Sequence, residues 1–156
     1  MEAKKRVDVV NIQLVKEKSI FYEGRTIRNP KETYILLQDF LRYSDREKFI
    51  VVCLNAKNEP INICTICVGS VNKAFVSPMD VMKPAILSNS YKIILAHNHP
   101  SGDPNPSVDD YKMTENIRQA GEILGIEILD HVIIAGDSYF SFAAEQMLAN
   151  NAIKED

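Results

Sequence analysis

The sequence has 156 residues, with 18 basic and 21 acidic side chains and a formal net charge of −3. This length suits one domain, and we expect a single domain over residues 1–156. Hydrophobic residues make up 46% and charged residues 25% of the chain, a globular composition that excludes an intrinsically disordered protein. The acidic balance argues against a nonspecific DNA-binding protein, which usually carries a basic stripe.

Cysteine usage and the apolar runs indicate the compartment. Three cysteines cannot all pair, and an unpaired thiol fits a reducing compartment better than a secreted disulfide framework. The apolar runs are far shorter than the ~20 residues that cross a bilayer. Asp8 interrupts any signal-peptide core near the N-terminus. We therefore expect a cytoplasmic protein without membrane association.

Strand and helix patterns alternate along the chain. Asn29, Ser77 and Ser107 are candidate helix caps, because each precedes a stretch of helical spacing. Residues 91–96 are almost continuously apolar, which is typical of a strand covered on both faces. We expect strands over residues 7–15, 49–55, 61–68, 91–96 and 126–135, a short strand at 75–76, and helices over 30–42, 77–88, 107–124 and 142–149. This order predicts an α/β fold, with α+β as the alternative, in which helices flank a mixed sheet.

Two details of the helices can be predicted as well. Pro84 lies inside the helix over 77–88 and should kink it or loosen one turn. The helix over 107–124 should end at Gly125, a residue that favours the C-terminal stop of a helix. Its apolar spacing predicts a buried side made by Tyr111, Ile117, Ala120, Ile123 and Leu124.

The segment over residues 97–110, HNHPSGDPNPSVDD, contains the chain's most informative chemistry. His97 and His99 are two residues apart at the end of a predicted strand, so both imidazoles can point to the same side. A turn rich in Gly and Pro follows and leads into the helix that starts at Ser107. Asp110 lies in the first turn of that helix, where it can return to the two histidines.

Two neutral imidazoles and one carboxylate form a common zinc ligand set for hydrolysis, with the fourth position open to water. The same residues are also compatible with purely structural roles. The two histidines could form a hydrogen-bonded polar strand end. Ser107 and Asp110 have the spacing of a helix capping box, which does not exclude a metal site. Asp109 points in a different direction from Asp110 on the helix and is the less suitable ligand.

The pattern His97-x-His99-Pro100, followed by Ser107 and Asp110, resembles the JAMM metalloprotease motif of the JAB/MPN superfamily. The fuller string is similar to the RadC-like branch, as are the downstream segments LDHVI and YFSFA and the upstream pattern Arg46-Glu47-x-Phe49. The resemblance covers roughly residues 7–148. It implies a JAB/MPN fold of the cytidine-deaminase-like architecture.

The resemblance also implies roles for individual residues. His97, His99 and Asp110 would be the ligands of Zn²⁺. Glu47 would take a proton from water and later protonate the leaving amine. Ser107 would hydrogen-bond the oxyanion of the tetrahedral intermediate. Without the resemblance, Glu47 would be interpreted as a solvated charge.

Two further patterns are interpreted as structural. Cys64 and Cys67 have Cys-x-x-Cys spacing, but residues i and i+3 of a strand point to opposite faces and no second pair follows, so we expect core thiols. The sequence also argues against a zinc deaminase. Those enzymes use His-x-Glu followed by a later Pro-Cys-x-x-Cys, whereas this chain has His-x-His and its cysteine pair comes earlier. His131 follows Asp130 into an apolar strand, and we expect a hydrogen-bonded structural histidine there.

The leading functional hypothesis is a zinc-dependent hydrolase that cleaves a peptide or isopeptide bond in a protein or peptide substrate. The alternatives are a non-catalytic module that binds protein or DNA, and a metal-dependent nuclease linked to DNA repair. Typical full-length RadC-like proteins carry a helix-hairpin-helix segment, and we expect this chain to be the short form without that segment. We therefore expect DNA association to be weak, while the sequence leaves the oligomeric state open.

Overall fold

The computed structural model describes residues 4–69 and 76–148 and contains a five-stranded sheet with three helices in these ranges. The elements are α1 (Pro30–Leu41), β1 (Lys48–Leu54), β2 (Pro60–Val68), α2 (Pro78–Leu87), β3 (Lys92–Asn98), α3 (Val108–Leu124), β4 (Glu127–Ala135) and β5 (Ser138–Ser141). None of the three helices has the length and apolar character needed to cross a membrane.

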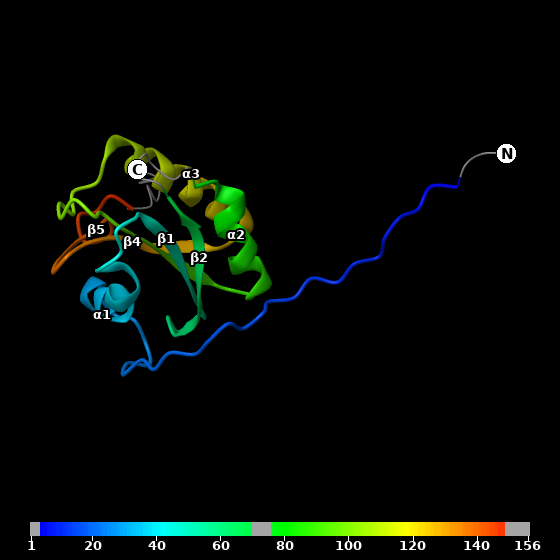
Figure 1. Cartoon of the computed structure of the whole chain (residues 1–156), viewed down its shortest axis with the longest axis horizontal. Helices are drawn as coiled ribbons and strands as arrows, with labels where there is room; N and C mark the ends of the chain where they lie inside the picture. The colour runs from blue at the N-terminus through cyan, green and yellow to red at the C-terminus, as the bar shows by residue number, and fades with distance from the viewer. Residues whose placement is uncertain (1–3, 70–75, 149–156) are drawn as a thin grey trace, which may run out of the picture.

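The strands form a mixed sheet in the order β2-β1-β3-β4-β5. β1 pairs antiparallel with both β2 and β3, β3 pairs parallel with β4, and β5 pairs antiparallel with β4. Helix α1 covers one face of the sheet, whereas α2 and α3 cover the other (Figure 1). The α/β prediction is confirmed, and β5 is an additional strand that the sequence patterns did not predict.

The helices begin where their caps predict. The side chains of Asn29, Ser77 and Ser107 each accept a hydrogen bond from a backbone N–H in the first turn of the following helix. α3 ends at Gly125, whose φ of 70° is in the left-handed region that glycine adopts without strain. α2 continues through Pro84 up to Leu87, so the proline does not divide this helix.

The central strands carry the core on both faces. Ile93 and Leu95 of β3 pack under α2 and α3, whereas Ile94 and Ala96 pack under α1. This alternation confirms that the apolar run is a strand covered on both faces. It also fixes which way the polar residues at the end of β3 point.

The buried side of α3 differs from the prediction. Thr114, Ile117 and Gly121 are the buried residues of this helix, whereas Ile123 is 86% exposed. Tyr111 and Leu124 are also exposed. Gly121 explains the rotation, because a Cβ there would collide with the backbone oxygen of Ile126. Helix α3 therefore packs closely against the backbone at Ile126 through Gly121.

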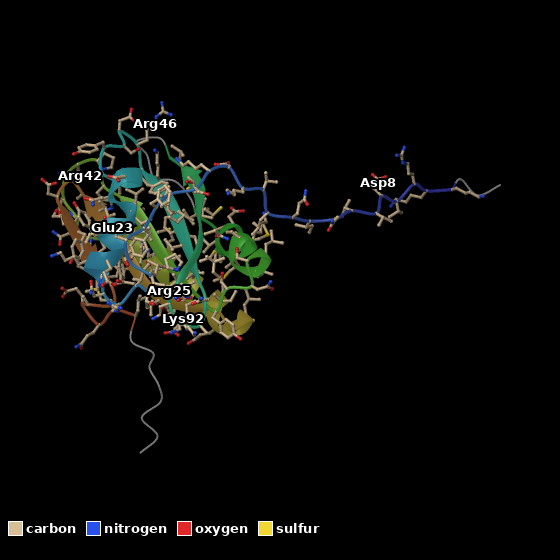
Figure 2. All side chains as sticks on the ribbon, turned by 90° about the horizontal axis from the view of Figure 1, so that it is seen from below. Asp8, Glu23, Arg25, Arg42, Arg46 and Lys92 are labelled. Atoms are coloured by element: carbon tan, nitrogen blue, oxygen red, sulfur yellow. The ribbon has the colours of Figure 1, made fainter. Side chains whose placement is uncertain are left out.

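The strand predicted over residues 7–15 is wrong. This segment is exposed and extended, but it pairs with no strand of the described residues, and it projects away from the body of the molecule (Figures 1 and 2). Val9 and Val10 are 101% and 78% exposed. Alternating apolar residues favour an extended backbone, but a strand also needs a neighbouring strand.

The helix predicted over residues 142–149 is also wrong for 142–148, which form successive turns; residue 149 lies outside the described residues. The backbone N–H of Ala143 donates to Asp130 Oδ1, and that of Ala144 donates to Ser141 Oγ. Gln146 has a φ of 58°, which ends any right-handed helical turn. Of the predicted strand at 75–76, residue 75 is likewise not described, and Val76 lies outside any strand.

The cysteines of β2 are arranged differently from the prediction. Cys64 lies opposite Val51 and Cys67 lies opposite Phe49, and these two β1 residues share one face of the sheet. A register irregularity between the two pairs shifts the alternation, so Cys64 and Cys67 point to the same face. Both are free and half-buried, rather than fully buried core thiols.

Candidate metal centre

The polar residues of the candidate site lie where β3 ends and α3 begins. His97 is the penultimate residue of β3, His99 follows the last residue, and Asp110 is the third residue of α3. His97 is 4% exposed, and the side chains of His99 and Asp110 are each 13% exposed. The site is therefore at the carboxyl end of a buried strand, a usual location in α/β proteins.

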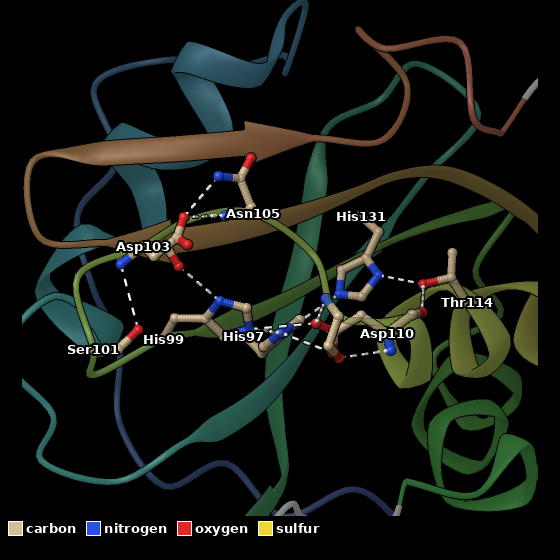
Figure 3. Close-up of polar contacts among 9 residues, drawn as sticks. His97, His99, Ser101, Asp103, Asn105, Asp110, Thr114 and His131 are labelled. Atoms are coloured by element: carbon tan, nitrogen blue, oxygen red, sulfur yellow. Dashed lines mark hydrogen bonds and ion pairs between the residues drawn. The ribbon is translucent and has the colours of Figure 1, made fainter.

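Three ligand atoms converge at this place. Nε2 of His97 lies 3.0 Å from Nε2 of His99. The Asp110 carboxylate approaches both rings, with Oδ1 3.3 Å from His97 Nε2 and Oδ2 3.4 Å from His99 Nε2 (Figure 3). One ligand atom from each residue lies within 4.8 Å of the others. These three residues can hold a metal ion, and they are the three that the sequence predicts.

The loop after β3 orients His99. The backbone N–H of His99 donates to the carbonyl of Ile134 in β4, which continues the pairing beyond the end of β3. Nδ1 of His99 lies 2.9 Å from the carbonyl oxygen of Asp103. A carbonyl only accepts, so Nδ1 carries the proton and Nε2 of the neutral ring has a free lone pair for a metal.

The first turn of α3 fixes Asp110. Its backbone N–H donates to Ser107 Oγ at 3.1 Å, and its Oδ2 accepts from the backbone N–H of Ser107 at 2.7 Å. This is the predicted capping box. Burial by itself raises the pKa of Asp110, but in the metal-free site protonated His97 and His99 rings would donate hydrogen bonds to the carboxylate, and these outweigh burial and hold that pKa far below its usual range. The carboxylate therefore stays ionised, as a metal ligand requires.

The donor set fits Zn²⁺ chemically. Two imidazole nitrogens and one carboxylate oxygen are typical zinc ligands, and three protein ligands leave a position open. Asp109, the neighbouring carboxylate, is not a member of the converging group. Within the described residues, no cysteine joins a group of ligands either.

His131 lies directly behind His97. Its Nε2 is 2.8 Å from Nδ1 of His97, and its Nδ1 is 2.6 Å from the hydroxyl oxygen of Thr114. His131 is fully buried, and burial holds its pKa well below the ordinary value. Phe142 stacks on the ring with centroids 4.8 Å apart. This arrangement agrees with a hydrogen-bonded structural histidine, although its neighbour is a candidate metal ligand.

Glu47 lies at the same end of the sheet as the candidate metal ligands. It directly precedes β1, in which Phe49 pairs with His97. The pKa of His99 is raised mainly because its protonated ring can donate a hydrogen bond to Asp110, and to a smaller extent by the negative charge of Glu47. The described contacts of Glu47 involve its backbone, since its carbonyl accepts from Gly69. Its placement is compatible with the predicted role of proton carrier.

Two buried polar residues near the site were not singled out by the sequence patterns. Asn98, which is 2% exposed, holds the segment before β1 through three side-chain hydrogen bonds, including one from the backbone N–H of Lys48. Thr114, which is 3% exposed, forms a hydrogen bond between its hydroxyl oxygen and Nδ1 of His131. A possible signal for Thr114 was its position, one helical turn after Asp110 and on the same side of α3.

Comparison with known proteins gives a consistent result. The family described as the RadC-like JAB domain matches residues 27–147. A UPF0758 protein of Moorella thermoacetica is 46% identical over 138 residues, which are 88% of this chain and 60% of the relative. A UPF0758 protein of Rubrobacter xylanophilus is 42% identical over 149 residues, which are 94% of this chain and 65% of the relative. The chain thus spans about three fifths of the length of these relatives.

Proposed function

Because the chain belongs to the family of RadC-like JAB domains, we propose that it is a zinc-dependent hydrolase of the JAMM type. The observation that carries this proposal is the convergence of His97, His99 and Asp110 within 4.8 Å at the end of β3. When bound, a zinc ion lowers the pKa of water in its open position to about 7 and so supplies a nucleophile at neutral pH. The proposed reaction is cleavage of a peptide or isopeptide bond.

Two of the chain's own residues have chemical roles in this proposal. Glu47 accepts a proton as water attacks the amide carbonyl, and it donates that proton to the leaving amine. Ser107 donates a hydrogen bond from its hydroxyl to the oxyanion of the tetrahedral intermediate. The Ser107 oxygen already accepts from the N–H of Asp110, so its proton is available for a second partner.

The proposed partner is a protein or peptide, and the proposed location is the reducing cytoplasm, in which the three free thiols would remain unpaired. DNA association is proposed to be weak because the net charge is −3.

The experiment that tests the proposal combines metal analysis with a substrate screen. Purified protein is dialysed against a chelator, reloaded with zinc, and assayed on peptides, isopeptide-linked conjugates, single-stranded DNA and duplex DNA. We expect about one zinc per chain, a higher melting temperature with zinc, and amide cleavage that depends on zinc. Absence of zinc binding would overturn the metal centre, and zinc-dependent cleavage of DNA alone would favour the nuclease.

A further inference from the structure

A chain of hydrogen bonds connects helix α3 to His97 through His131. The Thr114 hydroxyl oxygen lies 2.6 Å from the backbone carbonyl oxygen of Asp110 and 2.6 Å from Nδ1 of His131 (Figure 3). Nε2 of His131 lies 2.8 Å from Nδ1 of His97. The three linked side chains are between 0% and 4% exposed. Water therefore has little access to these hydrogen bonds, and the chemistry of the linked groups determines which atom donates and which accepts.

The chemistry of these groups determines which atom donates in each bond. A carbonyl oxygen only accepts, so the single hydroxyl proton of Thr114 goes to the carbonyl of Asp110. Thr114 can then only accept from His131, which places a proton on Nδ1 of His131. A neutral His131 has a lone pair on Nε2, and this lone pair must accept from an N–H at Nδ1 of His97.

The same reasoning determines the metal-facing atom of His97. With the proton on Nδ1, Nε2 carries the lone pair, and this is the atom 3.0 Å from His99 Nε2 and 3.3 Å from Asp110 Oδ1. The opposite tautomer would point an N–H into the group of ligand atoms. His99 reaches the required tautomer by another route, through the Asp103 carbonyl.

We propose that Thr114 and His131 are positioning residues that fix the Nδ1–H tautomer of His97 and so direct its Nε2 lone pair to the metal. The proposal rests on the metal-binding function proposed above. Asp110 takes part in two ways. Its carboxylate is a candidate metal ligand, and its backbone carbonyl accepts the first hydrogen bond of the chain that leads through Thr114 and His131 to His97. The metal site and the fold of α3 are therefore connected through His131.

A pair of variants at Thr114 isolates the hydroxyl. Thr114→Val keeps the branched shape but leaves Nδ1–H of His131 without an acceptor, so His131 should move its proton to Nε2 and donate to His97. His97 would then carry its own proton on Nε2. We expect zinc affinity to fall by about 10–100-fold, the usual effect of losing the partner of a ligating histidine. Thr114→Ser retains the hydroxyl and should restore both the tautomer and the affinity.

A second pair at His131 removes the dependence on a single variant. His131→Leu removes the acceptor for His97, whereas the side-chain amide oxygen of His131→Gln can replace it. We expect zinc binding to be weaker in the leucine variant than in the glutamine variant. Equal affinity in two folded variants would overturn the proposal.

The test uses the whole chain with two readouts, competition of the protein with a zinc-binding dye and ¹H–¹⁵N NMR of the histidine rings. In the zinc-free wild type at about pH 8, well above the ordinary histidine pKa, His97 and His131 should both show Nδ1–H. A wild-type His97 with Nε2–H, or a Thr114→Val protein with unchanged zinc affinity, would overturn the positioning role. A wild type with the expected tautomers but without zinc binding would instead overturn the metal centre itself.

Discussion

The side chain of Asn98 accepts a hydrogen bond of 2.7 Å from the backbone N–H of Lys48. Asn98 lies between the two histidines of the candidate site, but on the opposite face of β3, where its amide also donates to the carbonyls of Ser44 and Arg46. It thereby holds the segment that contains Glu47 against the strand that leads to the candidate metal ligands. The end of β3 thus carries the two candidate ligands on one face and, on the other face, the asparagine that holds the segment containing the proposed proton carrier.

We therefore expect Asn98→Ala to lower turnover without removing zinc. Release of the segment displaces Glu47, and an error of about 1 Å in a catalytic group can reduce the rate by ~10²-fold. Backbone groups left unpaired should also lower the free energy of unfolding by roughly 1–3 kcal/mol. The measurements are turnover on the identified substrate, zinc content and denaturant unfolding.

The matched control for Asn98→Ala is Asn62→Ala. Asn62 donates a side-chain hydrogen bond of 2.8 Å to Ser88 at the other end of the sheet. The Asn62→Ala variant should have a lower free energy of unfolding but an unchanged turnover per folded molecule. Equal loss of turnover in both variants would mean that Asn98 does not act through Glu47.

The ligand set can be tested with Asp110→Asn. The amide oxygen of asparagine can still accept from the N–H of Ser107, so the start of α3 should survive, whereas the negative charge of the ligand is lost. We expect a large loss of zinc on dialysis and a nearly unchanged melting temperature of the metal-free protein. Asp109→Asn is the control and should keep its zinc. Full retention of zinc by Asp110→Asn would show that the residue is only a helix cap.

DNA binding gives an independent test of the alternatives. The net charge of −3 provides little phosphate neutralisation. Titration with duplex DNA at about 150 mM salt should give a dissociation constant no tighter than roughly 10⁻⁶–10⁻⁴ M, the range of ordinary nonspecific contacts. Binding below micromolar concentration with a steep salt dependence would contradict this expectation and favour a nuclease or a DNA-binding module.

Local sequence signals predicted most of the fold and the group of residues that could hold a metal ion. The caps at Asn29, Ser77 and Ser107 are determined by neighbouring residues, and so is the alternation of the buried strand β3. His97 and His99 meet because residues i and i+2 of an extended chain share a side. Asp110 joins them because the capping box fixes the first turn of α3.

The features that the sequence did not predict depend on contacts between distant segments. Residues 7–15 have the alternation of a strand, but pairing requires a neighbour that sequence spacing does not reveal. Residues 142–148 have a helical composition, but Asp130 in β4 accepts the N–H of Ala143, which redirects the chain. The irregular pairing of β2 with β1 turns Cys64 and Cys67 to one face, and no residue of the Cys-x-x-Cys pattern indicates this shift.

Ser107→Ala should affect both stability and turnover. Loss of the cap on α3 should cost about 1 kcal/mol, which corresponds to a fall of roughly 2–4 °C in melting temperature for a chain of this size. Loss of the proposed oxyanion donor should reduce turnover by ~10²–10³-fold. Ser77→Ala is the matched control, because Ser77 caps α2 in the same way. It should show the thermal effect alone, and an equal effect of both variants on turnover would exclude the oxyanion role.

Glu47→Gln should separate proton transfer from metal binding. The amide preserves the size of the side chain but cannot accept the proton of the attacking water. Zinc content and melting temperature should therefore remain near the wild-type values, while turnover falls by ~10²–10⁴-fold, the usual contribution of general acid–base catalysis. Asp45→Asn, which removes an exposed charge two residues earlier, should retain turnover. Near-native turnover of Glu47→Gln would mean that another group activates the water, and zinc loss in this variant would make Glu47 a ligand.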